Sequence, residues 1–221
     1  MIAKLCTWAP TREEAIEKMR VALDSFEVEG IGHNLPFLSA VMDHPKFVSG
    51  EMTTAFIAEE YPEGFDGVEL PEAELRRTAA ACAAMHRVAE IRRARVSGRM
   101  DNHERKVGSD WNVALQGQSF DVVTRADHDG ATVAFADGTE MRVSGDWTPG
   151  DQLATMSVDG APLVLKVGKI SGGFRIRTRG ADLKVHVRTP RQAELPSRLP
   201  EKRPPDPSKT PPRPTAGRGG D

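Results

Sequence analysis

The chain has 221 residues, of which 38% are hydrophobic and 28% are charged, and its formal net charge is −2. This length allows one or two domains, and the balanced charge gives no general attraction to nucleic acid or to an anionic membrane. The two cysteines, Cys6 and Cys82, are too few for a disulfide framework or a structural zinc site, and their apolar neighbours predict two buried thiols. No signal peptide pattern or stretch of ~20 apolar residues is visible, so we expect a cytoplasmic protein without a membrane or nucleic-acid partner.

The first 65 residues are predicted to be mainly helical. Ile2–Trp8 has the composition of a strand. Thr11 and Glu14 then have the T-x-x-E spacing of a capping box, which indicates a helix start. Two further short helices are predicted, one capped by Asn34 and ended by His44-Pro45, the other running from Thr53 or Thr54 to Tyr61. These pieces are typical of the end of a domain, so residues 1–65 are expected to be poorly stable alone.

A long helix is predicted next, from Pro71 to about Val96, with Pro71 suited to a first turn. Its middle, Thr78–Ala84, consists almost entirely of small residues, which allow other backbones to approach from several sides. A coiled-coil strand is the alternative because some residues fit a heptad, but arginines on the seam disfavour it.

After Gly98 the hydrophobic period changes from 3.6 to 2, which indicates strands separated by Asp-Gly and Gly-Gly turns. Eight antiparallel strands can close into a small barrel, and the alanine-rich helix before them could fill it. The predicted fold class is α+β, with a helical region followed by a long helix wrapped by, or packed against, an eight-stranded antiparallel β-barrel. The predicted strands are Trp111–Gln116, Ser119–Arg125, Thr132–Phe135, Glu140–Ser144, Gln152–Val158, Leu163–Val167, Phe174–Thr178 and Leu183–Arg188.

Residues 190–221 carry nine of the 16 prolines and, after Leu199, no aromatic or branched aliphatic side chain. Such a segment buries too little apolar surface to offset its ordering entropy, so we expect it to be disordered. The predicted organisation is therefore a helical region at 1–65, a helix-plus-barrel domain at 70–189 and a disordered Pro/Arg-rich tail at 190–221.

Motifs for catalysis are scarce. The phosphate-loop pattern fails because Ile170 follows Gly168-Lys169 where Ser or Thr is required. His103-Glu104 has the residue types of a metal or acid–base pair, but a charged loop is more often solvated or a partner surface. The remaining histidines in turns are expected to be structural, and His86 is expected to pack within the long helix. We predict no catalytic, cofactor-binding or metal-binding residue.

Residues 1–65 contain the patterns M-I-x-K-L, T-R-x-x-A-I-x-x-M and G-x-x-H-N-x-x-F/L-L. In combination they resemble the end of the biotin carboxylase domain of biotin-dependent acyl-CoA carboxylases. Glu60–Phe65 and Phe47–Phe56 are most similar to the α subunit of bacterial propionyl-CoA carboxylases. Residues 70–189 resemble that subunit's middle domain, which joins the biotin carboxylase to the biotin carrier. The resemblance implies a long helix wrapped by an eight-stranded barrel.

The segment Gly98–Arg105 resembles the loop by which this middle domain docks the carboxyltransferase β subunit. The resemblance implies a hetero-oligomer of β subunits and several α subunits, with biotin and ATP/Mg as cofactors of the holoenzyme. That holoenzyme is a ligase converting propionyl-CoA, ATP and bicarbonate to methylmalonyl-CoA. We call the implied β-binding residues the hook; they are Arg99, Met100, Asp101, Asn102, His103, Glu104 and Arg105.

The sequence contains neither the family's ATP-grasp region nor the biotin-accepting Met-Lys-Met. The chain alone is therefore expected to bind no cofactor and to be inactive, supplying scaffold and β-subunit docking. Two alternatives stay open. One is the same role in a 3-methylcrotonyl-CoA-type carboxylase, because the β subunit selects the substrate. The other is a free-standing β-barrel binding module, which an empty barrel mouth would favour and a helix-filled barrel would oppose.

Overall fold

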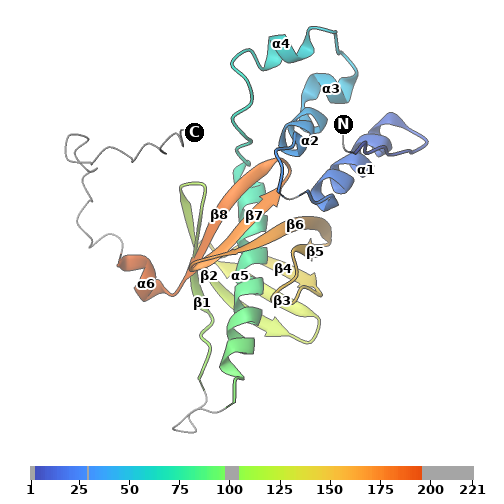
Figure 1. The fold of residues 1–221 in the computed structure, drawn as a ribbon. Coiled ribbons are helices and arrows are strands. Elements are labelled where there is room, and N and C mark those ends of the chain that lie inside the picture. Colours follow the sequence, from blue (N-terminus) through green and yellow to red (C-terminus); the bar gives the residue numbers. More distant parts are fainter. Residues whose placement is uncertain (1–2, 29, 98–104, 196–221) are drawn as a thin grey trace, which may run out of the picture.

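The computed structural model describes residues 3–28, 30–97 and 105–195. A closed β-barrel surrounds one long helix, and a group of shorter helices lies beside one end of the barrel (Figure 1). The helices are α1 (Arg12–Ser25), α2 (Leu35–Asp43), α3 (Pro45–Ser49), α4 (Phe56–Glu60), α5 (Glu72–Ala94) and α6 (Pro190–Glu194).

The helix predicted from the T-x-x-E pattern is confirmed as α1. The Thr11 side chain accepts a hydrogen bond from the Glu14 backbone N–H at 3.3 Å and so satisfies one free donor of the first turn. The strand predicted at Ile2–Trp8 is wrong for its described part, because residues 3–8 are irregular. A strand needs a hydrogen-bonded neighbour, and every described strand pairs within the barrel.

The eight strands follow one another around the barrel in sequence order, and β1 pairs with β8 to close it. Three of the hairpin turns have positive φ at two successive residues, Gln116-Gly117, Asp159-Gly160 and Arg179-Gly180. Two such residues match the twist of a two-residue hairpin, which explains the glycine in each pair. The strands are β1 (Asp110–Leu115), β2 (Gln118–Asp127), β3 (Gly130–Phe135), β4 (Glu140–Gly145), β5 (Leu153–Val158), β6 (Ala161–Ile170), β7 (Gly173–Thr178) and β8 (Ala181–Arg188).

Helix α5 runs through the barrel, so the predicted α+β fold with a helix inside an eight-stranded barrel is confirmed (Figure 1). Residues from Ala79 to Ala83 have no exposed surface at all. Because alanine adds only one methyl group, strands can approach this helix from every side. The coiled-coil alternative for this segment is therefore wrong.

The segment that follows the barrel begins with a short helix, α6. Thr189 and Gln192 form a reciprocal capping box at its start. The expectation of a disordered tail at 190–221 is therefore wrong for Pro190–Glu194, where local capping supplies order that composition does not reveal. Residues 196–221 lie outside the described part of the chain.

Candidate functional site

The barrel interior is packed with side chains rather than open. Inward-facing residues of the strands, such as Val113, Leu165 and Ile176, are fully buried with the alanines of α5 in one core. Cys82 belongs to this core, and burial raises the pKa of its thiol far above the usual value. A thiol held in its protonated form is inert, which confirms that Cys82 is a buried hydrophobe. Cys6 is exposed, so the matching expectation for it is wrong.

The helix that fills the barrel also holds the returning end of the predicted hook. The Glu90 carboxylate is buried, with its residue only 5% exposed, and it accepts a hydrogen bond from Arg105 at 2.5 Å. Arg93 donates to its other oxygen at 2.6 Å. Burial alone would raise the pKa of Glu90, but the hydrogen bond from Arg93 and the charge of Arg105 outweigh it and lower that pKa. The Glu90 carboxylate is therefore ionised, and it holds Arg105 against α5 by a charged hydrogen bond.

The other end of this connection is held by a second arginine of α5. Arg87 donates to the backbone oxygen of Gly108 at 3.0 Å, just before β1 begins. Of the seven predicted hook residues, Arg105 alone falls within the described part of the chain. The other six, Arg99 to Glu104, lie outside it. Sequence reasoning missed Glu90 and Arg87, because a charged residue near a helix end normally indicates a solvated surface.

Aromatic side chains gather around the last turns of α5. His86 packs edge-on against Trp111 with ring centroids 4.8 Å apart, and Trp147 meets Phe174 edge-on at 5.8 Å. Burial lowers the pKa of His86, so its imidazole is neutral at pH 7. The predicted packing role of His86 is confirmed.

Two of the remaining histidines each lie beside one acid, His44 beside Glu60 and His128 beside Asp129. His44 contacts Glu60 at 3.1 Å, whereas His33 and His128 are exposed. Within the described ranges no group of three or more His, Cys, Asp and Glu could hold a metal ion.

Outside the gaps at 1–2, 29, 98–104 and 196–221, no helix is long and apolar enough to cross a membrane.

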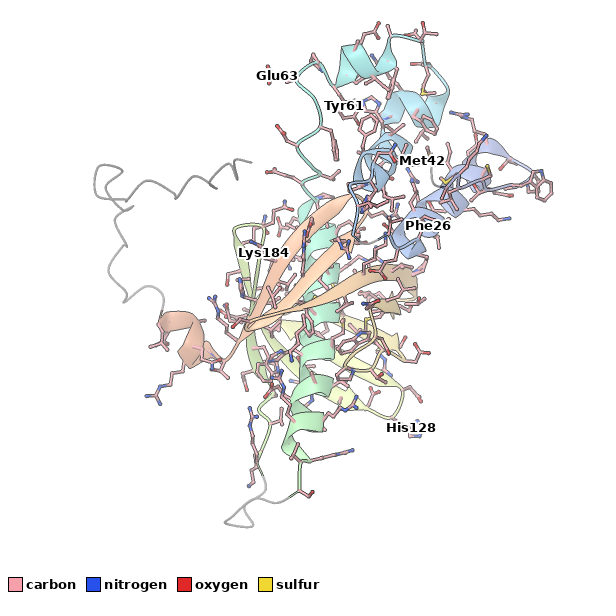
Figure 2. All side chains as sticks on the ribbon, in the orientation of Figure 1. Phe26, Met42, Tyr61, Glu63, His128 and Lys184 are labelled. Carbon is pink, nitrogen blue, oxygen red and sulfur yellow. The ribbon has the colours of Figure 1, made fainter. Side chains whose placement is uncertain are left out.

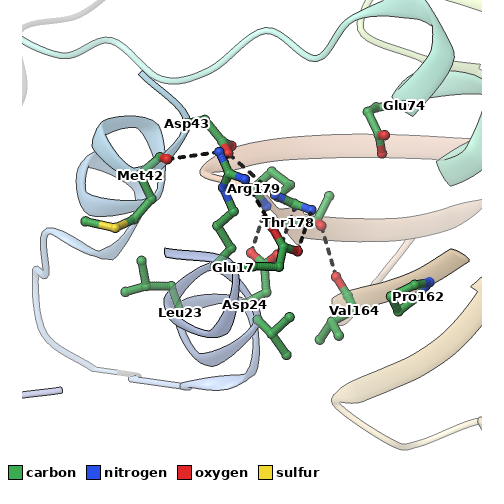
Figure 3. A network of polar contacts seen from close by, with 12 residues as sticks. Glu17, Leu23, Asp24, Met42, Asp43, Glu74, Pro162, Val164, Thr178 and Arg179 are labelled. Atoms are coloured by element: carbon green, nitrogen blue, oxygen red, sulfur yellow. Dashed lines mark hydrogen bonds and ion pairs between the residues drawn. The ribbon is translucent and has the colours of Figure 1, made fainter. Parts of the chain in front are cut away.

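A polar network joins α1 to the barrel (Figure 3). Asp24, at the end of α1, accepts a hydrogen bond from the Arg179 backbone N–H at 2.8 Å and lies 3.8 Å from the guanidinium of the same residue. Lys166, a buried lysine of β6, donates to the backbone oxygen of Leu23 at 2.9 Å. Burial raises the pKa of Asp24 to about 6, although Arg179 and Lys166 oppose that shift. Arg179 also contacts Asp43 at 3.5 Å, which ties α2 to the same hairpin.

Comparisons with known proteins match both parts of the chain. Residues 1–59 match the biotin carboxylase C-terminal domain family, and residues 78–202 match the propionyl-coenzyme A carboxylase BT domain family. A propionyl-CoA carboxylase alpha chain of Ruegeria pomeroyi is 81% identical over 209 residues, covering 95% of this chain and 31% of that protein. A mitochondrial counterpart of Mus musculus is 30% identical, covering 95% of this chain and 30% of that protein.

A biotin carboxylase of Halalkalibacterium halodurans is 51% identical over 57 residues, covering 26% of this chain and 13% of that protein. The chain thus spans about three tenths of the length of the propionyl-CoA carboxylase alpha chains it matches. The BT-domain match covers more than half of the chain, including most of α5 and all eight strands. The resemblance inferred from sequence motifs is confirmed, and the chain belongs to the propionyl-CoA carboxylase BT domain family.

Proposed function

We propose that this chain is the scaffold and β-docking part of the α subunit of a propionyl-CoA carboxylase. The observation that carries the proposal is a BT-domain barrel whose interior is filled by α5. In the whole enzyme, propionyl-CoA is carboxylated with bicarbonate and ATP, with biotin and magnesium as cofactors bound by other parts of the assembly. The partners in this proposal are the carboxyltransferase β subunit and further α subunits, in the cytoplasm.

The hook is the proposed contact with the β subunit. Its returning end is fixed where Glu90 binds Arg105, and the approach to β1 is fixed where Arg87 binds the Gly108 carbonyl. Such anchors reduce the conformational entropy that a docking loop loses on binding. The sequence from Ser97 to Asp110 is long for a connection within a compact domain, and connections of this length are usually either functional or disordered.

The two alternatives are less well supported. The 81% identical relative is named as a propionyl-CoA carboxylase alpha chain, which favours propionyl-CoA over 3-methylcrotonyl-CoA as the substrate of the assembly. The helix-filled interior opposes a free-standing binding module, because residues such as Ala81 and Leu165 pack there with no exposed surface, although a cavity of about 650 Å³ remains at the end of the barrel where α5 emerges. We also propose that residues 70–189 fold alone, whereas residues 1–65 are poorly stable without the rest of their domain.

The test is capture of the cognate β subunit by the immobilised chain. The double variant Met100→Ala/His103→Ala is expected to weaken capture at least about tenfold while leaving the circular dichroism spectrum unchanged, since a few central residues carry most of an interface's energy. His128→Ala, a change at a side chain 98% exposed in another loop, is the matched control. Unchanged capture by the double variant would move the docking surface away from the hook, to the outer faces of the strands.

A further inference from the structure

A cavity of about 650 Å³ opens at the end of the barrel where α5 emerges. Its walls come from the last turns of α5, the loop between β4 and β5, and the hairpin of β6 and β7. Trp147 and Phe174 form an apolar wall, and both are buried. A volume of this size is typical of ligand pockets rather than of packing defects. We call this cavity the barrel mouth.

One wall of the barrel mouth is an open strand edge. Strand β6 extends to Ile170, but its neighbour β5 begins at Leu153, which pairs with Lys166. The Val167 N–H still donates to the Gln152 carbonyl at 2.7 Å, beyond the start of β5. Backbone groups alternate in direction along a strand, so the N–H and C=O of Lys169 point to the same side as those of Val167.

On that side Lys169 has no backbone partner among the described residues. An unpaired N–H and C=O at a strand edge form a template for one further strand. Lys169 lines the barrel mouth together with Gly168 and Gly172. The edge therefore fits a short extended peptide.

The barrel mouth is also cationic. Lys169 pairs across the ladder with Phe174, so the two side chains lie on the same face, toward the mouth. Its ammonium has no ion pair within the described residues. Arg92 lines the same cavity and donates to the Pro149 carbonyl at 3.2 Å. Hydrogen bonds from Thr148, and to a lesser extent the charge of Arg92, lower the pKa of the nearby Asp151 carboxyl. Asp151, the carboxylate among the described lining residues, is already bonded to Thr148.

We propose that the barrel mouth is a second docking site, which binds an extended acidic segment of the β subunit as an added strand on β6. This proposal rests on the proposed function, because it takes the β subunit as the partner. Positive charge selects an acidic segment, the free N–H and C=O of Lys169 select an extended backbone, and the aromatic wall accommodates an apolar side chain beside the acid. The mouth adjoins the described end of the hook, because Arg93 lines the mouth and shares the Glu90 carboxylate with Arg105.

The experiment measures binding of the purified β subunit to the full chain and its Lys169 variants. Lys169→Glu reverses the charge and keeps the backbone N–H, whereas Lys169→Gln only removes the charge. We expect about tenfold weaker binding for Lys169→Glu and a smaller loss for Lys169→Gln, with unchanged melting temperatures. Lys184→Glu is the control, because Lys184 is an exposed lysine on the outer face of β8 (Figure 2). Equal binding by all four proteins would overturn the proposal.

Hydrogen–deuterium exchange provides the second readout. Peptides covering residues 167–172 should gain protection when the β subunit binds, because the Lys169 amide becomes hydrogen-bonded. If Lys169→Glu loses binding but the wild-type chain gains no protection at residues 167–172, strand addition is overturned and only a charge contact at Lys169 remains. If the Met100→Ala/His103→Ala variant fails to bind while the Lys169 variants bind normally, docking at the hook is supported and docking at the barrel mouth is overturned. The opposite pattern supports docking at the mouth and overturns docking at the hook. A wild-type chain that captures no β subunit overturns both proposals.

Discussion

Replacing Asp24 by Asn tests whether a buried ionised carboxylate weakens the contact between α1 and the barrel. The Asp24 side chain is 9% exposed, and burial raises its pKa from 3.8 to about 6. A pKa raised by about two units corresponds to ~3 kcal/mol of stability, at ~1.4 kcal/mol per unit. The folded chain binds the proton more tightly than the unfolded chain. The stability that the protonated Asp24 carboxyl contributes is therefore fully present below pH 4 and is lost as the pH rises through about 6.

The Asn side chain has nearly the same shape, keeps an oxygen for the Arg179 N–H and cannot ionise. About 2 kcal/mol of the wild-type loss falls between pH 4.5 and pH 7.5. The free energy of unfolding of Asp24→Asn should therefore rise relative to wild type by that amount over this range. Contributions from other titrating groups cancel, because both proteins contain them.

The assay is urea unfolding at the two pH values, followed by circular dichroism at 222 nm. Asp146→Asn is the matched control, because Asp146 is exposed. The control measures what the loss of an exposed carboxylate does to the free energy of unfolding at each pH value. A difference between Asp24→Asn and wild type that is independent of pH would refute the argument that burial of the Asp24 charge destabilises this contact.

Three further changes test the barrel. Gly173→Ala places a Cβ 1.9 Å from the Val185 carbonyl oxygen, so β7 and β8 must separate. The free energy of unfolding, measured by urea titration, should fall by at least ~2 kcal/mol. Gly168→Ala is the control and should be nearly neutral, because its Cβ would lie 3.5 Å from Arg175. Leu165→Ala should cost ~2–5 kcal/mol because the side chain is fully buried, against less than ~1 kcal/mol for Leu153→Ala, which is 37% exposed. Residues 70–189 expressed alone should give a dispersed amide NMR spectrum and a cooperative melt, since every strand finds both neighbours within that range. A collapsed spectrum would contradict independent folding of residues 70–189.

The barrel could be predicted from sequence because its signals are local. Asp159-Gly160 adopts the positive φ values that a two-residue hairpin requires, and this turn lies between two runs of alternating hydrophobicity. Each predicted strand therefore overlaps an observed one with small shifts at the ends. Helix α5 was predicted for the same reason, since Pro71 and the two glutamates after it mark its start without any tertiary information.

The polar anchors could not be predicted because they depend on contacts distant in sequence. The pattern of the strand containing Lys166 predicts a half-exposed side chain, yet α1 covers it and the Leu23 carbonyl accepts a hydrogen bond from its ammonium. The sequence predicts that Glu90 is a solvated charge on the helix surface, because it does not reveal that Arg105 lies beside it in the fold. The strand expected at Ile2–Trp8 failed for a related reason, because strand composition does not supply a neighbouring strand.

The order of the strands around α5 has a consequence for how the chain folds. Every neighbouring pair in the ring is joined by a hairpin except β1 and β8, where Val113 lies opposite Val187. The helix precedes all the strands, so the sheet wraps around a helix already synthesised and no segment has to thread through a closed ring. Until β8 emerges from the ribosome, the sheet has two free edges and the alanine face of α5 stays in contact with water on one side. Pairing of the last strand with β1 therefore completes the core in one step. A nascent chain that does not yet include β8 presents an open sheet to chaperones and to other nascent chains.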